Sequence, residues 1–323
     1  MKRKIGTALV ALFLIFNIAG AVDLYSKPPM WHGNASTVEG DGIVVQFLEN
    51  KPWYMIWIPG KNNTAVYIVK FNRLIEFLDL DNDNKFNMSI DYMLSHALLY
   101  SAMWDVSAKT INISGIIEIR VTLSAIILVQ AIGGAGGGAV VGSFNATFVN
   151  HIYSANVEVD AIPIAGGKEL KIDVIISGWP WINNESKLAL EIVFAGMFRG
   201  RQGIPECVHE RYQAKNKHMS RVRLAGGDAG YYAEFRYQEE AKIQQAAHTE
   251  PNMANVSSTN CFSKDSAVTW LVYPHFDGTL IHDPSIYVGS EGILEMLLKT
   301  PVIGIIVVAA ILIIAAILIK RRK

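Results

Sequence analysis

The feature that most constrains this chain is an uncharged apolar run near its C-terminal end, residues 301–319. The run begins at Pro301, consists almost wholly of Ile, Val, Ala and Leu, and is followed by Lys-Arg-Arg-Lys at 320–323. A helix rises about 1.5 Å per residue, so about 19 residues cross the roughly 30 Å hydrocarbon core of a bilayer. Basic clusters beside such a span stay on the cytoplasmic side. The sequence therefore predicts a transmembrane helix over 300–319, with the lipid bilayer as partner, and a cytoplasmic tail at 320–323.

The N-terminal end is typical of a secretory signal peptide, residues 1–21. Three positive charges within Met1–Lys4 precede an apolar stretch that ends in the small residues Ala19-Gly20-Ala21. This order of basic, apolar and small residues predicts cleavage by signal peptidase. The alternative is an uncleaved N-terminal anchor, but Asp23 and Pro28-Pro29 soon end any helix there.

The charge distribution supports the same topology. Seven of the 29 basic residues lie in the predicted signal and tail, and none of the 29 acidic residues does, so residues 22–300 carry a net charge near −7. Nucleic acid is excluded as a partner, because its phosphates require a positive protein surface. An acidic ectodomain outside the cell membrane, attracting divalent cations, is expected.

The ectodomain pattern predicts an all-β fold, mainly an antiparallel β-sandwich. Short runs rich in Val, Ile, Tyr and Trp alternate with turn residues at intervals of about ten, which is typical of such sandwiches. The expected strands are Gly42–Glu49, Trp53–Ile58, Ala65–Phe71, Ile111–Ser114, Ile116–Val129, Phe144–Ile152, Val157–Ile162, Leu170–Ile176, Leu188–Phe194, Arg221–Leu224, Tyr231–Tyr237, Ala267–Tyr273 and Ser285–Val288.

Few helices are expected in the ectodomain. Residues 238–248 combine strong helix formers with one apolar side and predict a surface helix, and residues 291–299 lead into the membrane helix. Residues 90–104 fit a helix or a strand. A polar segment near 196–205 predicts a division into a β-sandwich at 22–198 and a second β-rich part at 199–299.

The most informative local motif is the acidic stretch 79–91. Asp79, Asp81 and Asp83 stand at positions 1, 3 and 5 of a loop, where carboxylates can converge on a calcium ion that takes six to eight oxygens. Asn84 takes the place that such loops usually give to glycine, and asparagine tolerates positive φ. Phe86 falls where an apolar residue anchors the loop to the core.

The motif departs from a full calcium loop at its end. Position 12 is Ile90, so the acid that would bind through two oxygens is displaced by one residue. The predicted ligand set is Asp79, Asp81, Asp83, Lys85, Asn87 and Asp91. Asn87 also begins a glycosylation sequon and cannot easily serve both purposes. The alternative to a structural calcium site is an acidic, solvated turn.

Modification and disulfide sites follow from the predicted compartment. Asn-x-Ser/Thr sequons, which require exposure to be used, begin at Asn34, Asn62, Asn87, Asn112, Asn145, Asn184 and Asn255. The chain has two cysteines, Cys207 and Cys261, and outside the cell a bridge between them is expected. The alternatives are two free thiols, or a Cys207–His209 nucleophile pair.

A glycine-rich, uncharged segment at 123–142 permits three interpretations: a core strand followed by a glycine loop, a fusion-type segment that inserts into an opposing membrane, or a second membrane span. Glycine disfavours a helix by about 1 kcal/mol per residue, which favours the strand and loop.

Two further stretches could form binding or catalytic sites. Residues 199–223 are basic and could bind an anionic polymer or glycan, although such runs are usually solvated. His275, Asp277, His282 and Asp283 could form a metal or hydrolytic site if they converge in space. The ordinary alternative is a pair of turns that end the last strands, so no catalytic residue is predicted.

The order of several segments resembles that of uncharacterised archaeal surface proteins with a C-terminal anchor. The resemblance rests on a strand at 66–78 running into the acidic loop, then Lys171-Ile-Asp173-Val, Trp179-Pro-Trp181 and Leu188-Ala-Leu190, and His282-Asp-Pro-Ser285 before the anchor. It implies an anchored extracellular β domain and supplies no activity.

The expected function is that of a noncatalytic, membrane-anchored surface protein: an adhesion, envelope or sensor ectodomain with a surface-protein or glycan partner. The alternatives are an anchored extracellular hydrolase acting on glycans or peptides, based on the His/Asp residues, and a fusion protein using 123–142.

Overall fold

The computed structural model describes residues 36–39, 42–47, 51–59, 65–132, 138–198, 207–214, 217–225, 230–245, 250–263 and 266–290. The predicted signal peptide, the predicted membrane helix and tail, and the sequon residues Asn34 and Asn62 lie outside these ranges. Within these ranges, no helix has the length and apolar character needed to cross a bilayer. All described residues belong to one compact unit, Trp31–Lys323.

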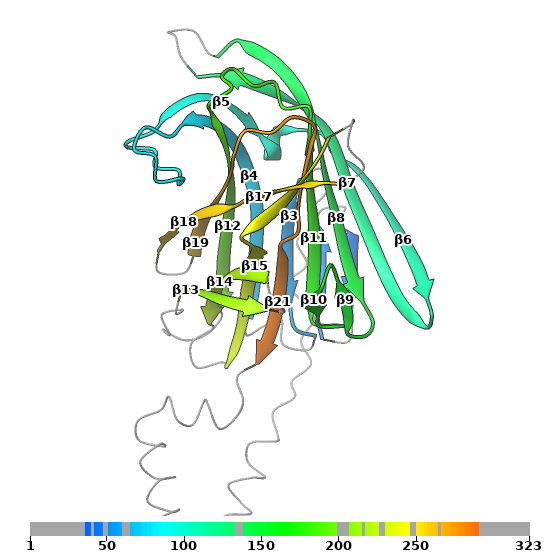
Figure 1. Cartoon of the computed structure of the whole chain (residues 1–323). Helices are drawn as coiled ribbons and strands as arrows, with labels where there is room; N and C mark the ends of the chain where they lie inside the picture. Colours follow the sequence, from blue (N-terminus) through cyan, green and yellow to red (C-terminus); the bar gives the residue numbers. More distant parts are fainter. Residues whose placement is uncertain are drawn as a thin grey trace, which may run out of the picture. The chain divides into compact units, whose positions relative to one another are not determined.

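The described chain is all-β and antiparallel throughout, as the sequence predicts (Figure 1). Nineteen of its strands belong to one hydrogen-bonded sheet, and β9 and β10 form a separate two-stranded sheet. The helical residues it contains form one 3-10 turn, η1 (Leu99–Ser101).

The first group of strands is centred on β4. Its hydrogen-bonded order is β1-β2-β3-β4-β12-β19-β18. The strands are β1 (Ser36–Glu39), β2 (Val44–Phe47), β3 (Trp53–Trp57), β4 (Ala65–Leu78), β12 (Lys187–Phe198), β18 (Ser257–Phe262) and β19 (Ser266–Tyr273).

The second group is centred on β11. Its order is β6-β7-β8-β11, and it then branches, because β11 pairs with β21 at one end and with β20 at the other. β21 continues to β15, β14 and β13, whereas β20 continues to β16 and β17. The strands are β6 (Asp105–Ile113), β7 (Ile116–Ala131), β8 (Val140–Tyr153), β11 (Glu169–Ser177), β13 (Cys207–Ala214), β14 (Lys217–Ala225), β15 (Tyr231–Gln238), β16 (Glu240–Gln244), β17 (Asn252–Asn255), β20 (Thr279–His282) and β21 (Ser285–Ser290).

Strand β5 (Tyr92–Leu98) connects the two groups. It pairs with β4 along most of its length and with β7 only at Ser95–Ala131 and His96–Gln130. The hairpin of β9 (Val157–Val159) and β10 (Ile162–Ile164) joins β8 to β11 in the chain. Ile162 and Ile164 pack with Met219 of β14 in a small buried cluster.

The two groups meet across the main apolar core. Phe71 of β4 lies 4.9 Å from Phe148 of β8 between ring centroids, and Tyr54 of β3 and Trp104 extend the aromatic contacts. Alternate residues of β4 point to this core because side chains of a strand alternate between its two faces. The other face carries Ile75 and Phe77 in a second buried cluster.

The expected strands are present with ends shifted by a few residues, except one. The single strand expected at Val157–Ile162 is wrong, because Asp160 and Ala161 adopt positive φ and form the turn between β9 and β10. The stretch 90–104, which fitted helix or strand, forms β5 and η1. The predicted surface helix at 238–248 is wrong, because residues 240–244 form β16, which pairs with β17 and β20. Ala241 and Ile243 are buried, whereas the other three residues of β16 are half-buried. This alternation is the two-residue period of a strand.

The glycine-rich stretch contributes to a long hairpin. Residues 123–131 belong to β7 and residues 140–142 to β8, and the two strands pair from Glu118–Tyr153 to Gln130–Val140 (Figure 1). Strands also pair across the predicted division near 196–205, since β11 bonds to β20 and β21, and β12 bonds to β19.

Candidate metal centre

The acidic loop 79–91 connects β4 to β5 and is fixed by an aromatic anchor. Phe86 is 2% exposed and its ring lies 4.9 Å from Phe77 and 4.7 Å from Trp270, measured between centroids. The anchoring role predicted for Phe86 is thus confirmed. The loop is consequently held against the face of β4, β12 and β19 that points away from the main core.

The backbone of the loop turns tightly at two asparagines. Asn82 has φ 57° and Asn84 has φ 60°, so the left-handed conformation expected at Asn84 is confirmed. Asparagine adopts this region more readily than most residues. Side-chain carboxylates accept hydrogen bonds from backbone amides around these two asparagines. Asp81 Oδ1 accepts from the Asp83 amide at 3.4 Å, and Asp83 Oδ1 accepts from the Lys85 amide at 2.8 Å.

Three carboxylates converge in this loop. Asp79, Asp81 and Asp91 each offer one oxygen, and these oxygens lie within 4.8 Å of one another. Asp91, displaced by one position in the sequence, therefore joins the cluster. It also holds the loop together, because its two oxygens accept from the Leu80 amide at 3.2 Å and the Asn87 amide at 2.6 Å.

The other predicted ligands have different roles. Asp83 lies 3.6 Å from the Lys85 ammonium, and the Asn87 side-chain oxygen accepts from the Ser89 amide at 3.0 Å. Asp83 does not belong to the converging group of carboxylates. The structure thus brings together three of the four predicted carboxylate ligands.

The side chain of Asp79 is buried, as is Asp91, whereas Asp81 is exposed. The Asp79 side chain is 3% exposed, and its Oδ2 accepts from the Lys187 ammonium at 2.5 Å and the Asn84 amide at 2.9 Å. Its Oδ1 is buried and accepts no N–H or O–H donor among the described residues; the neighbouring Asp81 is itself a carboxylate and could donate only when protonated. A buried carboxylate oxygen without a partner is costly, unless a ligand occupies it.

The charges of the cluster influence one another. Burial raises the pKa of Asp79, but its bonds to Lys187 and Asn84 outweigh burial and hold the pKa below its usual value. Desolvation and the neighbouring carboxylates Asp79, Asp83 and Asp91 raise the pKa of Asp81 despite a bond from the Asp83 amide. A divalent cation between these groups would relieve that repulsion.

Lys187, at the start of β12, is the residue that sequence reasoning missed. Its ammonium bonds to Asp79 Oδ2 and, at 2.7 Å, to the side-chain oxygen of Asn84. Register places it opposite Phe77 on β4, beside the loop. No local pattern links Lys187 to a loop about a hundred residues earlier, so only the strand pairing could have found it.

The His/Asp residues near the C-terminal strands do not converge on one site. His282 is buried, with Nδ1 2.9 Å from the Tyr273 hydroxyl and Nε2 2.9 Å from the Gln238 carbonyl oxygen. Both ring nitrogens are therefore occupied, and burial lowers the pKa of His282 to about 4. His275 lies 3.7 Å from Asp277, away from these contacts.

Asp283 belongs instead to a row of charges that crosses the second strand group. Its oxygens lie 3.5 Å from the Lys171 ammonium and 3.8 Å from that of Lys242. Lys171 also bonds to Asp173, and Lys242 bonds to Asp160 at 2.5 Å.

The row continues through His151 on β8. Its Nδ1 lies 2.7 Å from Glu118 and its Nε2 lies 3.0 Å from Asp173, and Arg120 bonds to Glu118 at 2.6 Å. Burial alone would raise the pKa of Asp173, but His151 and Lys171 lower it to about 2. Each buried charge of this row has an opposite neighbour, which gives the row a structural role.

A second buried carboxylate fastens the loop 178–186. Glu76 of β4 is fully buried, and its Oε1 accepts from the Ile182 amide at 2.8 Å, the Asn183 amide at 3.1 Å and the Ser186 hydroxyl at 2.7 Å. Its Oε2 accepts from the Ser95 hydroxyl at 2.8 Å. No ammonium or guanidinium bond to Glu76 is seen in the described part of the chain, so neutral donors alone satisfy it.

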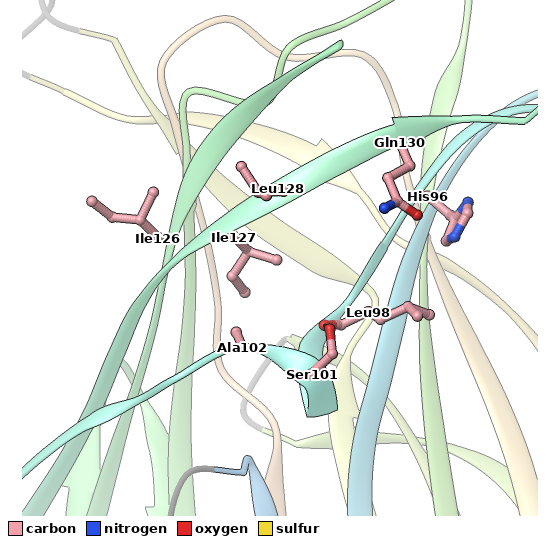
Figure 2. Close-up of a pocket in the computed structure, with 8 residues that line it drawn as sticks. All are labelled: His96, Leu98, Ser101, Ala102, Ile126, Ile127, Leu128 and Gln130. Carbon is pink, nitrogen blue, oxygen red and sulfur yellow. The ribbon is translucent and has the colours of Figure 1, made fainter. Parts of the chain in front are cut away.

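A pocket opens where β5 and β7 separate (Figure 2). It has a volume of about 250 Å³ and is lined by His96, Leu98, Ser101, Ala102, Ile126, Ile127, Leu128 and Gln130. After the two residue pairs that join β5 to β7, the chain leaves β5 and forms η1, whereas β7 extends past these pairs. Apolar side chains dominate the lining, and none of the lining residues is Asp, Glu, Lys or Arg.

The described sequon residues Asn87, Asn112, Asn145, Asn184 and Asn255 are all exposed. Their exposure meets the requirement for glycosylation, which stays a prediction. Cys261 is exposed and has no disulfide partner among the described side chains. The Cys207 side chain lies outside the described atoms, so the bridge between the two also stays a prediction.

No protein-family model and no curated protein matches this sequence.

Proposed function

We propose that the protein is a noncatalytic, membrane-anchored surface protein whose ectodomain is a β-sandwich carrying a calcium site in the loop 79–91. The residues Asp79, Asp81 and Asp91 supply the carboxylates of the site. The observation that carries the proposal is the carboxylate of Asp79, which belongs to the converging group and whose buried Oδ1 accepts no N–H or O–H donor in the described chain. The resemblance to archaeal surface proteins agrees with this assignment.

The sandwich assignment rests on the two strand groups. Phe71 of the first group packs on Phe148 of the second, and the strands within each group are antiparallel. Two antiparallel sheets that share an apolar core constitute a sandwich. β5 hydrogen-bonds to both groups and would form the corner between the sheets.

The chemistry of the loop favours calcium over other cations. All three converging ligands are carboxylate oxygens, and no histidine or cysteine belongs to the described cluster. Hard oxygen ligands suit calcium and magnesium, and calcium accepts the less regular geometry of a short turning loop. Because Asp91 already joins the two ends of the loop, the ion would stabilise its conformation.

The anchor and its orientation rest on the uncharged run 301–319 and the basic residues at 320–323. Residues 22–300 would then lie outside the cell, where the exposed sequon residues and the expected Cys207–Cys261 bridge belong. A surface protein or glycan is the proposed partner. The hydrolase alternative gains no support, because His282 has both ring nitrogens occupied and Asp283 pairs with lysines.

Calorimetry on the purified full-length protein in detergent micelles tests the calcium site. The wild-type protein should bind calcium with measurable heat, and its melting temperature should rise in millimolar calcium relative to chelator. Asp81→Asn should abolish both effects without unfolding the protein, because Asp81 is exposed. Asp83→Asn, in the same loop but outside the cluster, is the matched control and should retain both. Absence of heat and of a melting shift in the wild type would refute the site.

A further inference from the structure

The turn end of the β7–β8 hairpin carries apolar side chains that nothing in the described chain covers. Ile126 is 73% exposed, Leu128 is 58% exposed and Val140 is 56% exposed, with Val141 beside them. Register places Leu128, Gln130 and Val140 on one face, because Gln130 pairs with Val140. Ile126 and Leu128 also line the pocket of Figure 2, so the exposed face and the pocket are continuous.

The hairpin is uncharged over an unusual length. Residues 121–157 contain no Asp, Glu, Lys or Arg. Large exposed apolar surfaces mark contact sites for proteins or membranes. A protein partner is usually held in register by charges or hydrogen bonds at the rim of the contact. Hydrocarbon penalises any charge, so the uncharged composition of the hairpin fits contact with lipid.

The strand directions define which membrane the hairpin can face. β8 runs away from the hairpin turn, β11 runs back toward it, and β21 runs away again, because consecutive pairs are antiparallel. β21 therefore ends at Ser290 at the end of the sheet opposite the hairpin turn (Figure 1). The predicted anchor begins about ten residues later, and ten residues reach at most about 35 Å. β7 alone has 16 residues, a length of roughly 50 Å, which is more than these ten residues can reach.

From these observations we infer that the apolar tip of the β7–β8 hairpin, formed by Leu128, Val140 and Val141, inserts into a lipid bilayer other than the one that holds the protein. This inference rests on the proposed anchor and its orientation. Ile126 pairs with Asn145, an exposed sequon residue on the same face. A glycan at Asn145 would therefore stand at the base of the tip and limit insertion to the residues beyond it.

Liposome tethering tests the inference with the full-length protein reconstituted into liposomes of neutral phosphatidylcholine. Co-flotation of the Leu128→Glu/Val140→Glu variant with its own liposomes first establishes the anchor, because this variant lacks the apolar tip. Fluorescent protein-free liposomes of the same lipid are then added, and those captured by the proteoliposomes are counted after separation. The wild-type protein should capture them.

Two variants separate the tip from the rest of the hairpin. Leu128→Glu with Val140→Glu should reduce capture at least about tenfold, since a charge in a bilayer is strongly disfavoured. Both positions are exposed, so the melting temperature should stay unchanged. Ile117→Glu, 44% exposed at the other end of β7, is the control and should leave capture unchanged.

Three results would overturn the inference. Capture only of liposomes that also carry the protein would identify a second copy as the partner. Absence of capture by the wild-type protein would show that the tip does not hold a second bilayer. Equal capture by the double variant and the wild type would show that the tip has no part in it. None of these results bears on calcium binding, and failure of the anchor would appear already in the flotation step.

Discussion

Replacing Glu76 should reveal how strongly one buried carboxylate holds the loop 178–186. In Glu76→Gln the retained oxygen can still accept from Ile182, Asn183 and Ser186, and the Ser95 hydroxyl can turn to accept from the new amide. The remaining bonds change from charge-assisted, about 1.5–3 kcal/mol each, to neutral, about 0.5–1.5 kcal/mol each. The amide is in turn less costly to bury than the carboxylate. We expect a net loss of about 2 kcal/mol.

Glu76→Ala removes every acceptor at once. Donors from the loop and from Ser95 would then lack a partner, each at about 1–3 kcal/mol where water cannot reach it, and a cavity would remain. We expect a loss of about 4 kcal/mol or more. Glu185→Gln, at an exposed position of the same loop, is the control and should change stability by less than about 0.5 kcal/mol.

Guanidinium denaturation of the full-length protein in detergent micelles measures these differences. Tryptophan fluorescence is a suitable signal, because the loop carries Trp179 and Trp181 and the indole nitrogen of Trp179 lies 3.5 Å from Glu76. The order of stability should be wild type, then Glu76→Gln, then Glu76→Ala. Losses below about 1 kcal/mol for both variants would show that water satisfies the loop donors, and would refute the reasoning.

The remaining predictions concern separate parts of the molecule. Because the folded pKa of His282 is about 4 against an ordinary 6.5, its contribution of about 3 kcal/mol is complete above pH 6.5 and is lost as the pH falls toward 4; denaturation at several pH values should show this slope, and His282→Gln should flatten it. Phe86→Ala should lower stability by about 3–5 kcal/mol and weaken calcium binding measured by calorimetry, since it releases the loop anchor; unchanged calcium affinity would separate the anchor from the site. Lys171→Met should lower the free energy of unfolding by about 3 kcal/mol, because it removes the ammonium shared by Asp173 and Asp283 and leaves them only His151 and Lys242; a neutral result would mean that water reaches these carboxylates. Thiol titration of the denatured, unreduced protein should find no free thiol if Cys207 and Cys261 are bridged, and two reactive thiols would disprove the bridge.

The strands could be predicted from sequence because their pattern is local. β4 and β7 are rich in β-branched residues, with aromatic residues in β4, and the expected ranges 65–71 and 116–129 lie within them. The failure at 240–244 has a physical cause. Its residues favour a helix in isolation, but β20 and β17 offer backbone partners on both sides, and this tertiary pairing outweighs the local preference.

The candidate site could be predicted only in part for a similar reason. The acidic loop, its left-handed Asn84 and its anchor Phe86 are encoded within thirteen residues and were foreseeable. Lys187 enters through the pairing of β12 with β4, a contact between residues far apart in the chain. Which carboxylates converge was also unpredictable, because it depends on loop bonds such as those of Asp91.

The row of charges from Arg120 to Asp160 has a consequence for how the strands find one another. Side chains alternate between the faces of a strand, so a slip of β11 by one position would turn Lys171 and Asp173 into the apolar interior. A slip by two positions would keep the face but separate each charge from its opposite neighbour. Misaligned pairings of β7, β8 and β11 are thus penalised electrostatically. The row of charges therefore favours the native register of these strands when the sheet assembles.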